Sequence, residues 1–357
     1  MKKIDKSVPF SATKAILSFF LVYHGKQSIL RLFLLGTLKL SILIVVPIAT
    51  FVHLIVVKKK ELDVPIAENV SIGISISAMT ILSTLVPFYS KEWTNVFEKL
   101  SDFKTFKKPS KLGKTIKLYN TLSIASSAYC GGGAVFYTIA CYFESKKCLD
   151  IDKENYAIFV VQFIMIFVTC VCGGAVNYLI CEVALYASLQ ISSLKTRFLE
   201  IIHIKAQEEQ DTKLNMWIQD HQSMIIILEE AKRLTKICVG AGSLSFALVC
   251  ASVANQIMNR NKPVGSVLHL VGWIASLFMH CHAGQIIMSD SESMAEAVYN
   301  SKWYKINLTT RKSILIILKR CQKPLTLDAL PQGSLNYPLF MMIAKSSYSL
   351  LTFLSNT

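Results

Sequence analysis

The chain has 357 residues, of which 52% are hydrophobic and only 17% are charged. Its mean hydropathy of +0.44 excludes a soluble globular protein of this length and favours a membrane protein with much apolar surface facing lipid. The net charge of +15 is attributed to membrane topology, and nucleic-acid binding is not expected.

Seven apolar windows follow one another along the chain, each long enough to cross the hydrocarbon core of a bilayer. They lie at 33–57, 66–89, 119–143, 156–188, 237–258, 264–288 and 335–354. Glycine pairs within them, such as Gly173 and Gly174, let neighbouring helices approach closely. Alternating strand patterns are absent, so the sequence predicts an all-α membrane protein with seven transmembrane helices.

The orientation follows from the basic residues, which favour the cytosol. The N-terminal segment and every second connection carry 28 Lys and Arg residues, whereas the other connections carry eight. The N-terminus is therefore predicted to be cytosolic and the C-terminus extracellular, opposite to a G-protein-coupled receptor. Within the cytosolic segment 1–32, apolar residues are expected to lie on the inner leaflet as a helix: Phe10, Ile16, Leu17, Phe19, Phe20 and Leu21.

The loop at 190–236 is long and rich in apolar residues at helical spacing. Leu194, Phe198, Ile201 and Ile202 form one such set, and Trp217, Met224, Ile227 and Leu228 form another. Two interpretations are open, an ordinary solvated loop and a helical domain that extends the fourth and fifth spans into the cytosol. The second is preferred, with segment 289–334 completing a cytosolic helical anchor domain.

Enzymatic chemistry is not expected, because no metalloprotease, serine-hydrolase or phosphate-binding motif occurs. Ten cysteines are scattered mainly through the spans, where they act as small packing residues. A disulfide between Cys141 and Cys148 is possible. Neither Cys170 and Cys172 nor His280 and His282 are spaced as metal ligands on a helix, and no cofactor is predicted.

Three ionisable residues fall inside the apolar windows, where a charge is a functional candidate by default. Lys39 is close enough to the cytosolic end of its span to reach the interface. Glu182 lies where it can face the cytosolic domain. Lys345 lies midway along the last and most polar span, which either packs deep in protein or lines water.

The last 70 residues carry three stretches in a characteristic order. SES followed by AVYNSKWY ends at Tyr304, QKPL occupies 322–325, and AKSSYSLLT occupies 344–352. These stretches at the C-terminus of a polytopic chain resemble insect odorant receptors. The motifs cover about 291–354, while the seven-span layout fits the family throughout.

The resemblance implies an odour-tuned subunit that pairs with the co-receptor Orco. Four subunits would assemble through the cytosolic anchor in the plasma membrane of an olfactory neuron dendrite, and their last helices, here 335–357, would surround a non-selective cation pore. The family's apolar gate residues fall one and two turns after Tyr348. They match Leu351 and Leu354 or Ser355, and Thr352 could present a hydroxyl to hydrated cations.

The resemblance also implies a site for a small volatile, mainly apolar ligand in the outer part of the six-helix bundle at 33–288. Candidate residues share helix faces at i, i+4 spacing in spans two, three, four and six. They are Ser75, Met79, Tyr129, Gly133, Phe136, Tyr137, Phe163, Phe167, His269 and Trp273. Each such pair is more often ordinary core packing than pocket lining.

Two features depart from the family pattern. Asn336-Tyr337-Pro338 opens the last span, where Pro338 suits the first turn of a helix. The glycine-rich joint before this helix is reduced to Gln332-Gly333-Ser334. An insect gustatory receptor, which shares the architecture, is the nearest alternative, although its usual ending is missing. A transporter is a further alternative, although no inverted repeat is found.

Overall fold

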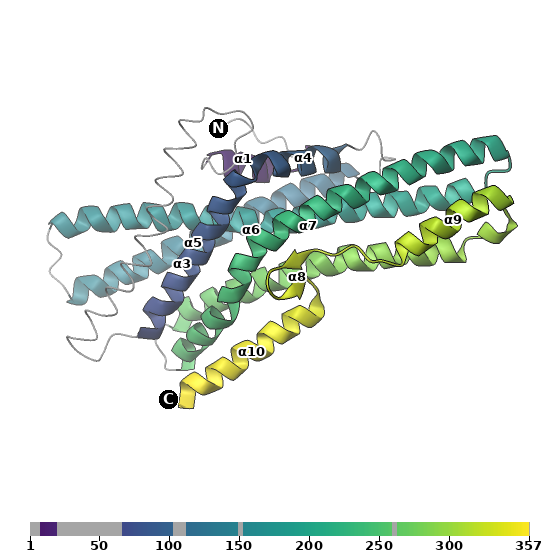
Figure 1. Ribbon diagram of the computed structural model, residues 1–357. Helices are drawn as coiled ribbons and strands as arrows, with labels where there is room; N and C mark the ends of the chain where they lie inside the picture. Colours follow the sequence, from purple (N-terminus) through teal and green to yellow (C-terminus); the bar gives the residue numbers. More distant parts are fainter. Residues whose placement is uncertain (1–7, 20–65, 103–111, 149–152, 259–262, 357) are drawn as a thin grey trace.

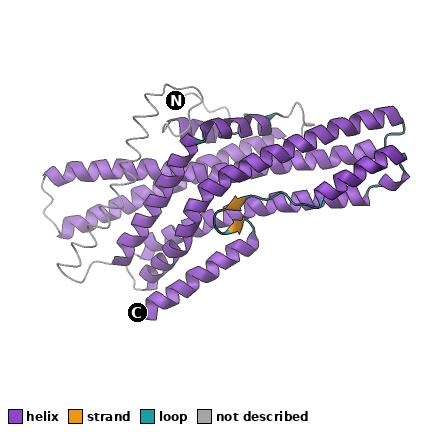
Figure 2. Cartoon of the chain, in the orientation of Figure 1, coloured by secondary structure: helices purple, strands orange, loops and turns teal. Residues whose placement is uncertain are grey.

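The computed structural model describes residues 8–19, 66–102, 112–148, 153–258 and 263–356. This part of the chain is mainly helical, as Figures 1 and 2 show. Its helices are α1 (Ser11–Phe19), α3 (Ile66–Phe88), α4 (Ser90–Ser101), α5 (Leu112–Cys148), α6 (Lys153–Ile202), α7 (Gln207–Met258), α8 (Pro263–Asn300), the short 3-10 turn η1 (Trp303–Lys305), α9 (Leu308–Cys321) and α10 (Tyr337–Asn356). The short strands β1 (Asp328–Ala329) and β2 (Gly333–Ser334) pair antiparallel.

Six of the seven apolar windows coincide with helices. They fall within or close to the bounds of α3, α5, α6, α7, α8 and α10, while the first window, 33–57, lies outside the described residues. Among the described residues, three helical stretches are long and apolar enough to cross a membrane: 166–202, 207–258 and 264–305. The helical fold class is thus confirmed apart from one two-stranded turn, while the seven-span topology and the orientation of the termini stay predictions.

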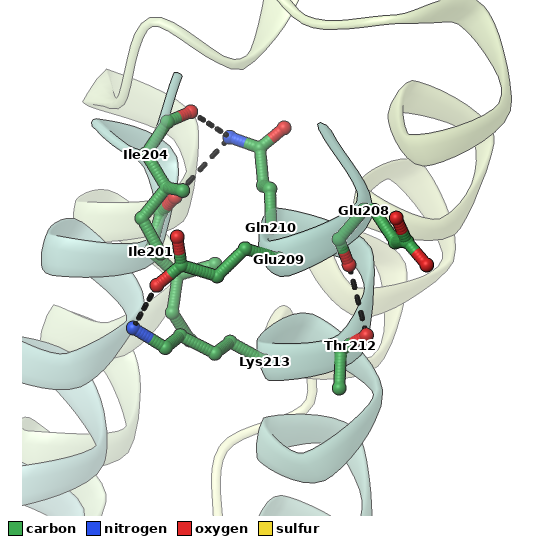
Figure 3. Close-up of polar contacts among 7 residues, drawn as sticks. All are labelled: Ile201, Ile204, Glu208, Glu209, Gln210, Thr212 and Lys213. Carbon is green, nitrogen blue, oxygen red and sulfur yellow. Dashed lines mark hydrogen bonds and ion pairs between the residues drawn. The ribbon is translucent and has the colours of Figure 1, made fainter. Parts of the chain in front are cut away.

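The segment 190–236 forms a helical hairpin, as the apolar spacing predicts. Helices α6 and α7 run far beyond the membrane length and are joined by only four residues. Gln210 closes the turn, because its buried side-chain amide donates to the carbonyls of Ile201 at 3.1 Å and Ile204 at 3.2 Å (Figure 3). Ile201 lies in the last turn of α6, where carbonyls lack an i+4 partner, and its carbonyl also accepts from the Ile204 N–H at 3.1 Å; Ile204 lies in the connection to α7.

The far ends of α6, α7 and α8 pack with α9 around one apolar core (Figure 1). All eight apolar residues that the spacing selected in this hairpin are buried. Trp217 lies at the centre, where its indole N–H donates to the carbonyl of Leu194 at 2.8 Å and its ring contacts Phe198. The helices expected in the anchor thus share a buried core, while their extent as a domain and their position in the cytosol stay predictions.

The N-terminal helix α1 packs against protein through Phe10 and Leu17, which corrects the expectation that these two residues lie on the membrane; Phe20, Leu21 and the side chain of Phe19 lie outside the described residues. Phe10 and Leu17 are buried in the core that includes α4 and α6. Thr13 donates its hydroxyl to the carboxylate of Glu182 at 2.6 Å, and the Ser123 hydroxyl approaches Thr13 at 2.7 Å. Glu182 therefore faces α1 and not the anchor.

A hairpin joint connects α9 to α10. We use this name for residues 325–336, which include β1, β2 and Gly333 in a left-handed conformation with φ of 101°. The joint packs on bare helix backbone: a Cβ on Gly240 of α7 would lie 2.5 Å from the carbonyl oxygen of Leu330, and Gly284 of α8 meets Leu335 in the same way. The segment that includes Gly333 and Ser334 thus forms a two-stranded turn that packs on two helical glycines.

Helix α10 begins as the sequence predicts. Pro338 occupies the first turn, where a missing N–H breaks no helical hydrogen bond. Asn336 precedes the helix and accepts from the backbone N–H of Leu339 at 2.9 Å through its side chain, as an N-cap residue does.

Candidate functional site

A cavity of about 440 Å³ lies among α3, α5, α6 and α8, within the size range of small-molecule sites. On α8 it occupies the part of the helix remote from α9. The residues lining it are Ser75, Ile76, Met79, Ala128, Tyr129, Cys130, Gly132, Gly133, Ala134, Phe136, Ile166, Cys170, Asn177, Gly265, Leu268, His269, Gly272, Trp273 and Ser276.

Helical periodicity explains how this lining arises. The α8 residues that reach the cavity recur every three or four positions from Gly265 to Ser276, so they form one stripe on that helix. Glycines create the room. A Cβ on Gly132 or Gly133 would have no atom within 4 Å, whereas one on Gly272 would lie 3.1 Å from the Tyr129 ring.

The structure brings seven of the ten sequence-predicted ligand residues together around this cavity. They are Ser75, Met79, Tyr129, Gly133, Phe136, His269 and Trp273. Phe163 and Phe167 instead stack on each other along α6 with ring centroids 6.4 Å apart, and neither is among the lining residues. Tyr137 belongs to α5, but its side chain lies outside the described part of the structure.

Sequence reasoning missed several lining residues, of which Asn177 and Ser276 are the most polar. Ser276 lies three residues after Trp273, so the helical stripe that selected His269 and Trp273 would have reached it if it had been extended by one turn. Asn177 was not selected, since a single polar residue in an apolar span gives no periodic signal. Its amide donates to the Met79 sulfur at 3.8 Å.

A small polar cluster stands out within the otherwise apolar lining. The indole N–H of Trp273 donates to Nε2 of His269 at 2.9 Å, and the Ser75 hydroxyl lies 3.1 Å from the same nitrogen. Tyr129 donates its hydroxyl to the carbonyl of Leu268 at 3.0 Å. None of the described lining residues carries a formal charge, so the cavity suits a neutral molecule.

The cavity is linked to the last helix through α8. Trp273 packs edge-on against Phe246 of α7, with ring centroids 4.8 Å apart. Two residues after Ser276, Phe278 packs against Phe340 of α10, and His282 is hydrogen-bonded to the Tyr337 hydroxyl at 2.8 Å. One helix therefore lines the cavity and holds the start of α10.

The predicted pore residues all belong to α10. Leu351 and Thr352 are half-buried, and the Thr352 hydroxyl donates to the Ser349 carbonyl at 2.8 Å. The side chains of Leu354 and Ser355 lie outside the described part. Lys345 is exposed in this single chain, so it does not pack deep within it. It lies with Ser349 along an open concave surface of α10.

The comparisons with known proteins agree on one family. The model of the 7tm Odorant receptor family matches residues 137–348. Odorant receptor 22c of Drosophila melanogaster is 27% identical over 145 residues, which are 40% of this chain and 36% of that protein. Odorant receptor 10 of Aedes albopictus is 24% identical over 204 residues, which are 55% of this chain and 54% of that protein. Each match thus spans only a third to about half of the relative.

The fold extends the likeness to nearly the whole chain. The insect olfactory receptor OR5 from Machilis hrabei superposes with a TM-score of 0.82 over 97% of both chains, at 13% identity. The same receptor in complex with eugenol gives 0.79 over 96% of both chains, at 12% identity. Because the family model covers more than half of the sequence, this chain belongs to the seven-transmembrane odorant receptor family of membrane proteins.

Proposed function

We propose that this chain is the odorant-binding subunit of a ligand-gated, non-selective cation channel. It acts in the plasma membrane of an olfactory neuron dendrite as part of a tetramer with the co-receptor Orco. The N-terminus and the anchor formed by 190–236 and 289–334 lie in the cytosol, and the cavity lies in the extracellular half of the bundle.

The observation that carries the proposal is the uncharged, glycine-widened cavity beside α8. A volatile odorant is small, neutral and mainly apolar, and burying it gains about 25 cal/mol for each Å² of apolar surface removed from water. Gly132 and Gly133 leave open space on α5 for such a molecule. Family membership supports the same assignment.

Gating follows from the double role of α8. An odorant that fits one arrangement of α3, α5, α6 and α8 better than another shifts the population toward it. Because Phe278 and His282 contact α10, this shift moves the last helix. Leu351 then moves out of the apolar constriction that closes the pore. Water enters the widened pore, which then conducts ions.

Assembly is supported by the surface of α10. Apolar side chains such as Met341, Tyr348 and Phe353 are exposed on this helix in the single chain. An apolar patch of this kind is typical of a protein or lipid contact. In the tetramer, other subunits and lipid cover it, while Lys345 and Ser349 are left near water.

The test is whole-cell current in cells that express the chain with and without Orco, during application of volatile esters, alcohols, aldehydes and terpenoids. We expect an odour-evoked cation current that requires both subunits. Gly133→Leu should abolish responses by filling the cavity, while Gly113→Leu, a change in open space at the remote start of α5, should not. No current despite confirmed surface delivery of both subunits would contradict the proposal.

A further inference from the structure

The imidazole of His269 has only one nitrogen engaged by the protein. Both of its hydrogen bonds use Nε2, one with the Trp273 indole N–H at 2.9 Å and one with the Ser75 hydroxyl at 3.1 Å. Within the described residues, Nδ1 has no hydrogen-bond partner. The ring itself lines the cavity.

The Trp273 contact fixes where the imidazole proton resides. An indole nitrogen only donates, so Nε2 must accept and must carry a lone pair. A neutral imidazole with its lone pair on Nε2 carries its proton on Nδ1. An imidazolium would instead set an N–H on Nε2 against the Trp273 N–H, so this geometry requires the neutral form.

The Ser75 hydroxyl is compatible with this assignment but does not fix it. It donates to the Ser71 carbonyl at 2.7 Å, which is the usual bond of a serine to the preceding helical turn. Its single proton is thus shared between this carbonyl and Nε2. Because the Trp273 indole already makes Nε2 an acceptor, Nδ1–H is the donor that no described residue uses.

We propose that the cavity selects neutral, mainly apolar molecules that carry an acceptor oxygen, such as ketones and esters, and that Nδ1–H of His269 donates to this oxygen. The inference rests on the proposed ligand role of the cavity and names its ligand class. A hydrocarbon of the same shape leaves the N–H without a partner, which lowers its affinity. Shape alone would not distinguish the two.

The test uses the purified full-length receptor and measures ligand affinity from thermal stabilisation, which needs no channel activity. Methyl ketones of graded chain length are each compared with the branched terminal alkene in which a methylene group replaces the carbonyl oxygen. We expect the best ketone to bind about tenfold more tightly than its alkene partner, a difference of about 1.4 kcal/mol.

Three variants locate the origin of this preference. His269→Phe keeps a flat ring but removes the donor, so the ketone and the alkene should bind equally. His269→Asn places an amide N–H near the position of Nδ1 and should restore part of the preference. Thr196→Ala removes a hydroxyl on the exposed surface of α6, outside the cavity lining, and it should leave the preference unchanged.

The outcomes separate this inference from the proposed function. Equal binding of ketone and alkene to the unmodified receptor, or a preference that His269→Phe retains or Thr196→Ala removes, would overturn the role of His269 and leave the cavity as the odorant site. Stabilisation that Gly133→Leu leaves intact would mean that ligands bind elsewhere, and both proposals would fail together.

Discussion

The carbonyl oxygen of Leu330 lies directly over Gly240 of α7, and the Leu330 N–H donates to the carbonyl of Lys236 at 3.3 Å. The hairpin joint therefore rests on helix backbone without an intervening side chain. Backbone atoms, unlike the end of a flexible side chain, cannot turn aside to accept an added methyl group.

Gly240→Ala should displace the joint, because the new Cβ would lie 2.5 Å from the Leu330 oxygen and 2.9 Å from its nitrogen. We expect a loss of about 1–3 kcal/mol of stability, as overpacking typically costs. The measurement is thermal unfolding of the purified receptor. Gly242→Ala is the control on the same helix, since its Cβ would meet only the Leu82 side chain at 3.6 Å. Equal behaviour of the two variants would contradict the tight contact.

Asp328 organises the same joint from within. Its carboxylate pairs with Lys232 of α7 at 3.3 Å and accepts from the Ser334 hydroxyl at 3.0 Å. Asp328→Asn should cost about 1 kcal/mol and make residues 325–336 more sensitive to limited proteolysis. Lys213→Ala breaks the exposed pair with Glu209 on the same helix and should change neither quantity. Unaltered proteolysis of the Asp328 variant would mean that backbone packing alone holds the joint.

The contact between Thr13 and Glu182 should stabilise the docking of α1. Thr13→Val leaves a buried carboxylate without its hydroxyl donor, at a cost of about 1–3 kcal/mol. Thr13→Ser keeps the hydroxyl and serves as the control. Thermal unfolding and protease cleavage near residue 20 report the effect. If Thr13→Val and Thr13→Ser unfold at the same temperature, the hydrogen bond does not hold the helix.

His221 in the anchor should make stability depend on pH. Its ring stacks on Trp217 with centroids 4.9 Å apart, and burial, followed by the Arg320 guanidinium, lowers its pKa from 6.5 to about 4. The unfolded chain therefore binds the proton first as the pH falls, so the stability that is fully present above pH 6.5 is lost progressively toward pH 4. The slope reaches about 1.4 kcal/mol per pH unit.

Thermal unfolding between neutral pH and pH 4 measures this dependence. His221→Phe keeps the stacking on Trp217 but removes the titrating group, so its unfolding temperature should fall less on acidification. Carboxylates titrate in both proteins, so their contribution to the acid dependence cancels in the comparison. Parallel curves for the two proteins would assign the acid sensitivity to groups other than His221.

Leu351 provides the test of the proposed gate. Leu351→Ser should favour a hydrated pore and raise the current without odorant by about tenfold, equivalent to a shift of about 1.4 kcal/mol in the closed-to-open equilibrium. Leu350→Ser makes the same change at the adjacent position, which faces a different direction on the helix. Similar basal currents in the two variants would argue against a specific role for Leu351.

The sequence was most informative where function or packing follows helical periodicity. Phe198 and Trp217 recur at core spacing and are buried, and His269 and Trp273 share the face that lines the cavity. Helix α4 was missed, although Trp93, Val96 and Phe97 carry the same signal in only 12 residues. A short helix between two spans is easily mistaken for part of a loop.

The remaining features depend on contacts between distant parts of the chain, which periodicity does not encode. Thr13 and Glu182 are 169 positions apart, and neither residue type indicates a partner. In the sequence, Gly240 and Gly284 look like ordinary small residues of their spans, and only the fold shows that the hairpin joint packs on them. In the same way, Phe163 and Phe167 have the spacing of a lining pair but turn to each other.

The docking of α1 has a consequence for biosynthesis. Thr13 is synthesised long before Ser123 and Glu182, so α1 cannot dock until α5 and α6 have been made. Its apolar residues, Phe10 and Leu17 among them, must be shielded by chaperones or by the membrane surface during that interval. In a nascent chain arrested before Glu182, α1 should therefore remain undocked. Docking of α1 would then show that translation has passed the middle of the chain.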